Sequence, residues 1–215
     1  MEAVAYVAVA GWDTIAPSQT PSTYICNYTD SKWAVGCNDG RVLFGAGNEV
    51  VDSLVLGGNS PVTALAALSD GSSRVAAIQA DGKLSVCSAG EQRPDTAVIL
   101  SDGLPPYTLA AGDLDKNDGG ESEIVVCDSR QGLWLFNADL TVAAGWREEP
   151  NDIASAYAVA EDNEDEDRAL LPKNGSPPTL ADIDGDDYPE IVIGGTNGVY
   201  AFNFKSALVD NWPAY

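Results

Sequence analysis

The sequence predicts an all-β protein made of repeated small antiparallel sheets. Four segments of the chain align on a glycine in a tight turn, and these glycines are Gly40, Gly82, Gly132 and Gly198. Each glycine follows an apolar run and precedes a segment in which apolar residues alternate, which is typical of a β-hairpin. Short apolar segments that end in tryptophan also recur, at 8–12, 142–146 and 208–213.

The first element of each unit is the hairpin. The four hairpins are expected at 33–45, 75–87, 123–137 and 190–203. Asp-Gly occupies the turn in the first two hairpins and Asn-Gly in the last, as short hairpin turns favour. Apolar residues follow each turn glycine at fixed offsets, two residues on at Val42, Leu84, Trp134 and Tyr200, and four residues on at Phe44, Val86, Phe136 and Phe202.

The spacing of the hairpins predicts the architecture. Successive turn glycines lie 42, 50 and 66 residues apart. Repeats of about 40 to 50 residues with four short strands are the signature of β-propeller blades. We therefore predict about four blades of four antiparallel strands, at roughly 20–60, 61–104, 105–150 and 175–215.

The remaining segments are placed around these blades. Residues 2–12 are expected to form the outer strand of a preceding or closing blade. Residues 151–174 are expected to be an acidic insertion that lengthens the last step between hairpins, either a solvated loop or, as the alternative, an extra cation site. The range 1–215 is then a single propeller domain or a partial propeller. It either closes a small ring or is a fragment of a larger propeller of about seven blades.

The charge of the chain excludes several partners. Acidic residues number 33 against 11 basic ones, which gives a formal net charge of −22. Such a charge repels nucleic acid and anionic membrane surfaces. The apolar N-terminal segment is also far shorter than the roughly 20 residues of a membrane span. Histidine is absent, so the commonest general base and transition-metal ligand are missing.

An acidic loop precedes the second strand of the fourth predicted blade. Asp182, Asp184, Asp186 and Glu190 occupy loop positions 1, 3, 5 and 9, and Tyr188 between them is a further candidate. Alternate acids in a tight turn suit a hard cation such as Ca²⁺, which takes six to eight oxygen ligands. Without a cation, these carboxylates would repel one another strongly. We therefore predict a structural calcium ion here.

The third blade carries a looser copy of this loop. Its candidate ligands are Asp113, Asp115 and Asn117 at positions 1, 3 and 5, with Glu123 immediately before the strand and Glu121 as the alternative to it. Two extra residues separate Glu123 from the other candidates. A second calcium ion is predicted there, which makes one or two ions in all. The first two blades keep only Asp30 and Asp70 at this place, so no site is expected in them.

The segments "DIDGDDYPEIVIGG" and "GDLDKNDGGESEIVVCD" resemble the FG-GAP/VCBS repeats of integrin-α-like propellers. The resemblance implies a radial propeller, with calcium held between the first and second strands of a blade. It also implies an extracellular, cell-surface or periplasmic setting. The family has glycine at loop position 6, where this chain has Asp118 and Asp187. Aspartate tolerates the left-handed conformation better than most residues, so the departure weakens the site without excluding it.

These features predict a non-enzymatic, calcium-stabilised module for binding, adhesion or scaffolding, which forms part of a larger chain or assembly. Its ligand would be a protein or a polysaccharide. The alternative is a propeller-fold carbohydrate-active enzyme, such as a polysaccharide lyase or hydrolase, or a carbohydrate-binding domain. An exposed Trp33 or Tyr107 could stack on a sugar ring, although each could equally belong to the core.

The four cysteines show no metal-binding or redox spacing. Cys26 and Cys37 flank a short segment that could be a hairpin, and an oxidising compartment would allow a disulfide between them. The alternative is that they are buried free thiols, which pack as small apolar side chains.

Overall fold

The computed structural model describes residues 21–29, 32–68, 73–92, 94, 96–100, 105–114, 121–129, 133–143, 177–195 and 198–202. These residues form antiparallel β-sheets joined by turns and loops. The all-β fold class is therefore confirmed. Within these ranges no helix is long and apolar enough to cross a bilayer. The predicted elements at 2–12, 151–174 and 208–213 lie outside them.

The first two sheets have four strands each, and hydrogen-bonded neighbours follow the order of the chain. The first sheet, called blade 1, contains β1 (Pro21–Thr29), β2 (Lys32–Cys37), β3 (Arg41–Ala46) and β4 (Glu49–Val55). Blade 2 contains β5 (Val62–Ala67), β6 (Arg74–Gln79), β7 (Lys83–Ser88) and β8 (Thr96–Ile99).

The next two sheets have three strands each within the described residues. Blade 3 contains β9 (Thr108–Gly112), β10 (Glu123–Cys127) and β11 (Leu133–Asn137). A single bridge from Phe136 to Val142 continues this sheet beyond β11. Blade 4 contains β12 (Thr179–Ala181), β13 (Glu190–Gly195) and β14 (Gly198–Phe202).

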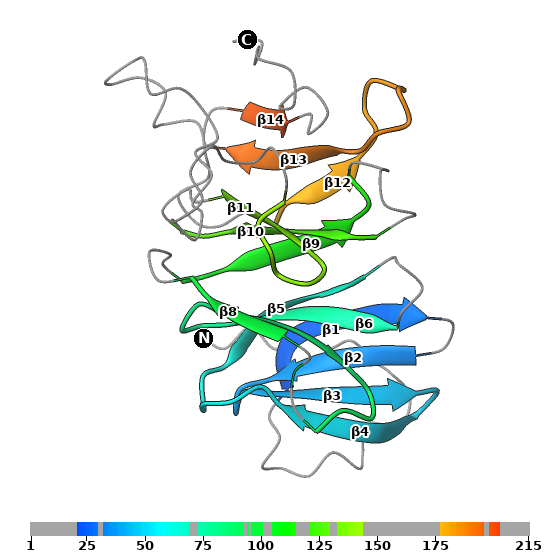
Figure 1. Cartoon of the computed structure of the whole chain (residues 1–215), viewed down its shortest axis with the longest axis vertical. Helices are drawn as coiled ribbons and strands as arrows, with labels where there is room; N and C mark the ends of the chain where they lie inside the picture. The colour runs from blue at the N-terminus through cyan, green and yellow to red at the C-terminus, as the bar shows by residue number, and fades with distance from the viewer. Residues whose placement is uncertain are drawn as a thin grey trace.

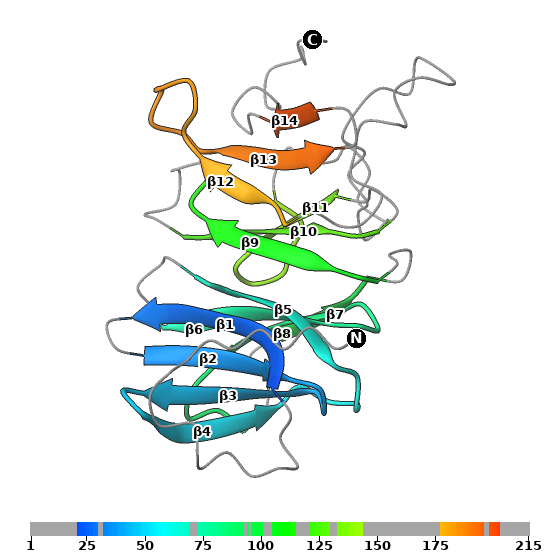
Figure 2. The same cartoon turned by 180° about the vertical axis from the view of Figure 1, so that it is seen from behind.

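The four sheets follow one another along the long axis of the molecule (Figures 1 and 2). Their first strands contact in series, because β5 lies against both β1 and β9, and β9 lies against β12. The first strands therefore share one edge of the array, as the inner strands of propeller blades do. In Figure 1 the loop between β12 and β13 projects from the same side as the arrowhead of β9.

Two of the predicted turn glycines lie in tight hairpin turns, and Gly132 lies outside the described residues. Gly40 and Gly82 have φ values of +81° and +83°, in the region where a side chain would be strained. Their amide N–H groups donate to Cys37 O and Gln79 O, at 3.2 and 2.9 Å. The strands after these two glycines pair with the strands before them, and the hairpins β10–β11 and β13–β14 pair in the same way.

The core lies between successive sheets. Side chains alternate along each strand, so one sheet contributes to two apolar layers. The layer between blades 1 and 2 includes Ala34, Phe44, Leu54, Val75 and Ala77. The layer between blades 2 and 3 includes Ile78, Leu84, Ile124, Trp134 and Phe136. The layer between blades 3 and 4 includes Leu114, Val125, Leu135, Ile191 and Ile193.

On the side of blade 1 that faces away from blade 2, the strands β2 and β3 also carry buried side chains. These side chains are Trp33, Val35, Cys37 and Leu43, which form a fourth apolar cluster. These residues alternate along β2 and β3 with those that face blade 2. Along the outer strand β4 this side is open, since Val50 and Val55 are 44% and 55% exposed.

Polar contacts link neighbouring blades at their margins. The Asp52 carboxylate of β4 accepts a hydrogen bond from Gly90 N of blade 2, at 2.6 Å. The Lys83 ammonium of β7 donates to Leu56 O, directly after blade 1. Gln79 of β6 donates through Nε2 to Ser60 O at 2.8 Å. These contacts fix the register of blade 2 against blade 1.

The expected hairpin between Cys26 and Cys37 forms, but its register separates the two cysteines. Cys26 pairs with Ala34, three positions along β2 from Cys37, which is about 10 Å at the rise of a strand. A disulfide requires Cα atoms within roughly 7 Å. Cys37 is accordingly a free, buried thiol.

Candidate metal centre

The loop between β12 and β13 begins and ends at a paired position. Ala181, the last residue of β12, lies opposite Glu190, the first residue of β13. Asp182 follows directly on β12, so the sheet fixes both the first and the last candidate ligand. The eight residues between Ala181 and Glu190 must therefore turn back within a short span.

Backbone amides hold the aspartates of this loop. The Asp182 carboxylate accepts from Gly185 N at 2.7 Å and from Asp187 N at 3.0 Å. Asp184 Oδ1 accepts from Asp186 N at 3.1 Å. Such Asx turns explain why aspartate favours these positions, since its short side chain reaches an amide two or three residues on. The loop is thus shaped by its own carboxylates.

Glu190 is the buried member of the loop, with 3% of its surface exposed. Its Oε2 accepts a hydrogen bond from Ile183 N at 2.8 Å. Its Oε1 is buried and has no hydrogen-bond partner among the described residues. A buried carboxylate oxygen without a partner is costly, because the charge has lost its water.

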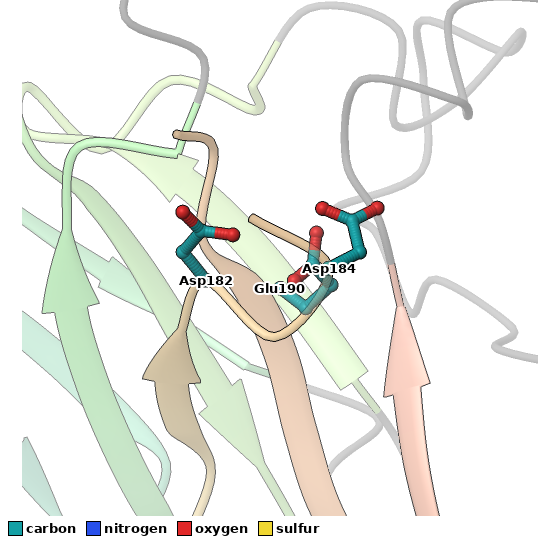
Figure 3. Close-up of side chains that lie close together, drawn as sticks. All are labelled: Asp182, Asp184 and Glu190. Atoms are coloured by element: carbon teal, nitrogen blue, oxygen red, sulfur yellow. The ribbon is translucent and has the colours of Figure 1, made fainter. Parts of the chain in front are cut away.

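Three carboxylates converge at this loop. One oxygen from each of Asp182, Asp184 and Glu190 lies within 4.8 Å of the others (Figure 3). Figure 3 shows Glu190 reaching from β13 into the space between the two aspartates. A set of three carboxylates fits a hard cation such as Ca²⁺, which binds oxygen ligands in flexible geometry. The unpartnered Glu190 Oε1 is a candidate ligand for such a cation.

Two other predicted ligands lie in the loop but outside this group of three. Asp186 is exposed, and its Oδ1 accepts from Tyr188 N at 2.9 Å. Tyr188 is half-buried. Asp187, at position 6, takes a φ of +70° and Gly185 a φ of +80°. Aspartate therefore occupies the left-handed conformation that glycine would adopt with less strain.

The loop of blade 3 repeats the anchor of blade 4. Glu123 is buried at the start of β10, and its Oε2 accepts from Leu114 N at 2.6 Å. Leu114 follows Asp113, just as Ile183 follows Asp182, so Glu123 occupies the place of Glu190. Glu121 is exposed, and Asp113 is half-buried. Asp115 and Asn117 lie outside the described residues.

The residue at loop position 2 differs sharply between these blades. Leu114 is fully buried at 0% exposure and belongs to the apolar layer between blades 3 and 4. Ile183 is 60% exposed. Nothing in the sequence marks this position, since both residues are simply apolar. Their surroundings differ because blade 4 covers Leu114, whereas no described sheet covers Ile183.

The aromatic candidates for sugar stacking are in the core. Trp33 is 8% exposed and donates through Nε1 to Gly47 O at 2.9 Å, while Tyr107 is 1% exposed. Of the two earlier interpretations, the core assignment is therefore correct for both side chains. Burial also raises the pKa of Cys37 to about 11 and that of Cys127 to about 12. Neither thiol provides a ready thiolate at neutral pH.

No protein-family model and no curated protein sequence matches the chain. Solved structures of β-propeller type do match its fold. Crystal structures of BBS1N in complex with ARL6DN, soaked with mercury or with lead, align with TM-scores of 0.51 and 0.52 at 10% and 14% identity. A WD40 domain from Toxoplasma gondii coronin aligns with a TM-score of 0.47 at 14% identity.

These alignments cover most of this chain but less than half of the matched chains. The alignments to BBS1N cover 82% and 80% of this chain, and 44% of the matched chain in both cases. The coronin alignment covers 80% of this chain and 42% of the coronin chain. The two BBS1N alignments and the four sheets show a fold of β-propeller type, and this chain spans less than half the length of the chains that it matches.

Proposed function

We propose that this chain is a calcium-stabilised β-propeller module that binds a protein partner and serves as a scaffold. The observation that carries the metal assignment is the buried Glu190 Oε1, which lacks a partner beside two further carboxylates. A cation would compensate that charge and hold β12 and β13 together through the loop. The loops of blades 3 and 4 carry the sequences that resemble FG-GAP/VCBS repeats. We therefore assign these blades to that repeat type.

The scaffold assignment draws on the fold and on the absence of histidine. One propeller of similar fold, BBS1N, was crystallised in complex with the protein ARL6DN. A protein is therefore the partner that we favour. The carbohydrate-binding alternative is weakened, because the two aromatic side chains suggested for stacking are buried. We propose an extracellular, cell-surface or periplasmic location, where calcium is plentiful enough for weak sites.

Thermal melting with calcium and with a chelator tests the metal assignment. A cation that binds only the folded state stabilises it by about 2.7 kcal/mol at a hundredfold excess over its Kd. We expect the melting temperature to rise by several degrees in calcium, and less in magnesium, which demands stricter octahedral geometry. A melting temperature indifferent to calcium and to chelator would reject the assignment.

A charge-matched pair of variants locates the effect. Asp184→Asn removes one carboxylate from the group of three and is expected to reduce the calcium-dependent rise. Glu91→Gln removes an equal charge from an exposed turn residue of blade 2 and should leave the rise unchanged. An equal loss in both variants would mean that calcium acts through general charge screening.

A further inference from the structure

Gly112, the last residue of β9, is in close contact with the next blade. A Cβ atom added to Gly112 would lie 2.8 Å from Cδ1 of Leu180 in β12, which is closer than two carbon atoms pack at their optimal separation. The φ of Gly112 lies outside the left-handed region, so the backbone itself does not require glycine there. A glycine in a strand often marks such a close approach. The absent side chain of Gly112 therefore leaves room for Leu180 of blade 4.

The repeat shows that the strand and its loop tolerate a side chain at this position. Gly112 pairs with Glu123 in blade 3, just as Ala181 pairs with Glu190 in blade 4. Gly112 and Ala181 are therefore equivalent, and alanine is compatible with the strand end in blade 4. The contact with Leu180, which only blade 3 makes, accounts for the glycine.

Leu180 also lies directly beneath the acidic loop of blade 4. It pairs with Ile191, and the next pair along the two strands, Ala181 and Glu190, closes the loop. Ile191 is 0% exposed in the apolar layer between blades 3 and 4, and Leu180 packs against the same layer. Asp182 follows Leu180 by two residues, and Glu190 directly precedes Ile191. Both ends of the loop are thus joined to residues that pack against blade 3.

Leu114 gives blade 3 a second fixed point in this layer. Its N–H donates to Glu123 Oε2 at 2.6 Å, which holds the backbone of Leu114 beside β10. Its side chain is fully buried in the same apolar layer as Ile191. Blade 3 therefore meets blade 4 with the bare backbone of Gly112 and with the side chain of Leu114, and both lie at the start of the blade 3 loop.

We propose that Gly112 and Leu114 of blade 3 are positioning residues for the cation site of blade 4. This inference rests on the calcium site of the proposed function. The carboxylates of that site converge only while the two strands that carry them keep their places, and the contacts with blade 3 fix those strands just below the loop. Calcium affinity therefore depends on how blade 4 docks on blade 3. By thermodynamic linkage, a bound cation strengthens the docking by the same factor.

Isothermal titration of the calcium-free full chain with calcium tests this proposal. The binding step that Asp184→Asn removes is the step of the blade 4 site. Gly112→Ala and Gly112→Val place increasingly large side chains against Leu180, and they are expected to raise the Kd of this step progressively, by about fivefold or more for valine. Valine favours strands more than glycine does, so the loss of affinity would not come from a weaker β9.

A rescue variant and a matched control separate positioning from general destabilisation. Leu180→Ala, added to Gly112→Val, removes the side chain that the valine displaces, so the double variant should bind calcium more tightly than Gly112→Val alone. Ala77→Val overpacks the layer between blades 1 and 2, which also costs stability, and it should leave the Kd unchanged. Circular dichroism at the titration temperature would show that each variant is folded.

The possible failures are distinguishable. An unchanged Kd in Gly112→Val would overturn this inference and leave the calcium site in place. An equal rise in Ala77→Val, or no rescue by Leu180→Ala, would overturn it as well, because the contact between Gly112 and Leu180 would then not be the cause. A wild type that takes up no calcium would reject the proposed site and this inference together.

Discussion

The loops of blades 3 and 4 share one anchor but differ in what surrounds it. In each loop a buried glutamate at the start of the second strand accepts the N–H of loop position 2. In blade 3 that position is a core residue, Leu114, whereas in blade 4 it is the exposed Ile183. The comparison teaches that the glutamate has two roles. It accepts this hydrogen bond in both blades, and in blade 4 its second, unpartnered oxygen is the one that we propose binds a cation.

The largest expected difference concerns position 2 itself. Leu114→Ala removes a fully buried side chain and should destabilise the protein by about 2 to 5 kcal/mol. Ile183→Ala changes an exposed side chain and should alter stability by less than about 0.5 kcal/mol. Urea unfolding at low protein concentration would measure both values. Equal losses would mean that Ile183 is also packed in solution.

The next largest difference in stability is expected between the two anchoring glutamates, measured without calcium. In chelator, Glu123→Ala leaves Leu114 N buried without an acceptor, which costs about 1 to 3 kcal/mol. Glu190→Ala should cost clearly less, because the exposed Ile183 leaves its amide near water and the variant removes the unpartnered carboxylate oxygen. Chelator-treated melting curves of the two variants give the comparison. A larger loss for Glu190→Ala would reverse the roles assigned to the two anchors.

The smallest effect is expected at loop position 6. Asp187 has a φ of +70°, so Asp187→Gly should relieve backbone strain and stabilise the loop by up to about 1 kcal/mol. Gly185→Ala places a Cβ at a φ of +80° in open space, and it should destabilise by about the same amount. Differential scanning calorimetry of the pair would check the signs. A destabilising Asp187→Gly would show that the carboxylate matters more than the strain.

Much of the fold could be predicted from the turn residues. Gly40 and Gly82 stand where a positive φ is required, and the alternation after them gave the strand pairing. The choice of Glu123 over Glu121 rested on its place at the strand start, and the hydrogen bond from Leu114 N gives Glu123 the place of Glu190. Local sequence carries these features because they depend on local geometry.

Other features depend on which sheet lies across from a residue, and local sequence does not record that. Trp33 and Tyr107 look equally suited to a binding surface or to a core, and both proved to be buried. The register that separates Cys26 from Cys37 depends on irregular pairing between β1 and β2. The contrast between Leu114 and Ile183 requires knowledge of the next blade. The calcium ions themselves stay a prediction.

The division of the core into separate layers has a consequence for unfolding. Each apolar layer joins only two neighbouring sheets, so cooperativity is transmitted stepwise from blade to blade, as in linear repeat proteins. Among the described residues, blade 4 contributes to one such layer, and local opening is therefore expected to begin there. A cation bound at its loop would oppose this local opening. It would therefore slow amide exchange in β12 and β13 more than in the other blades.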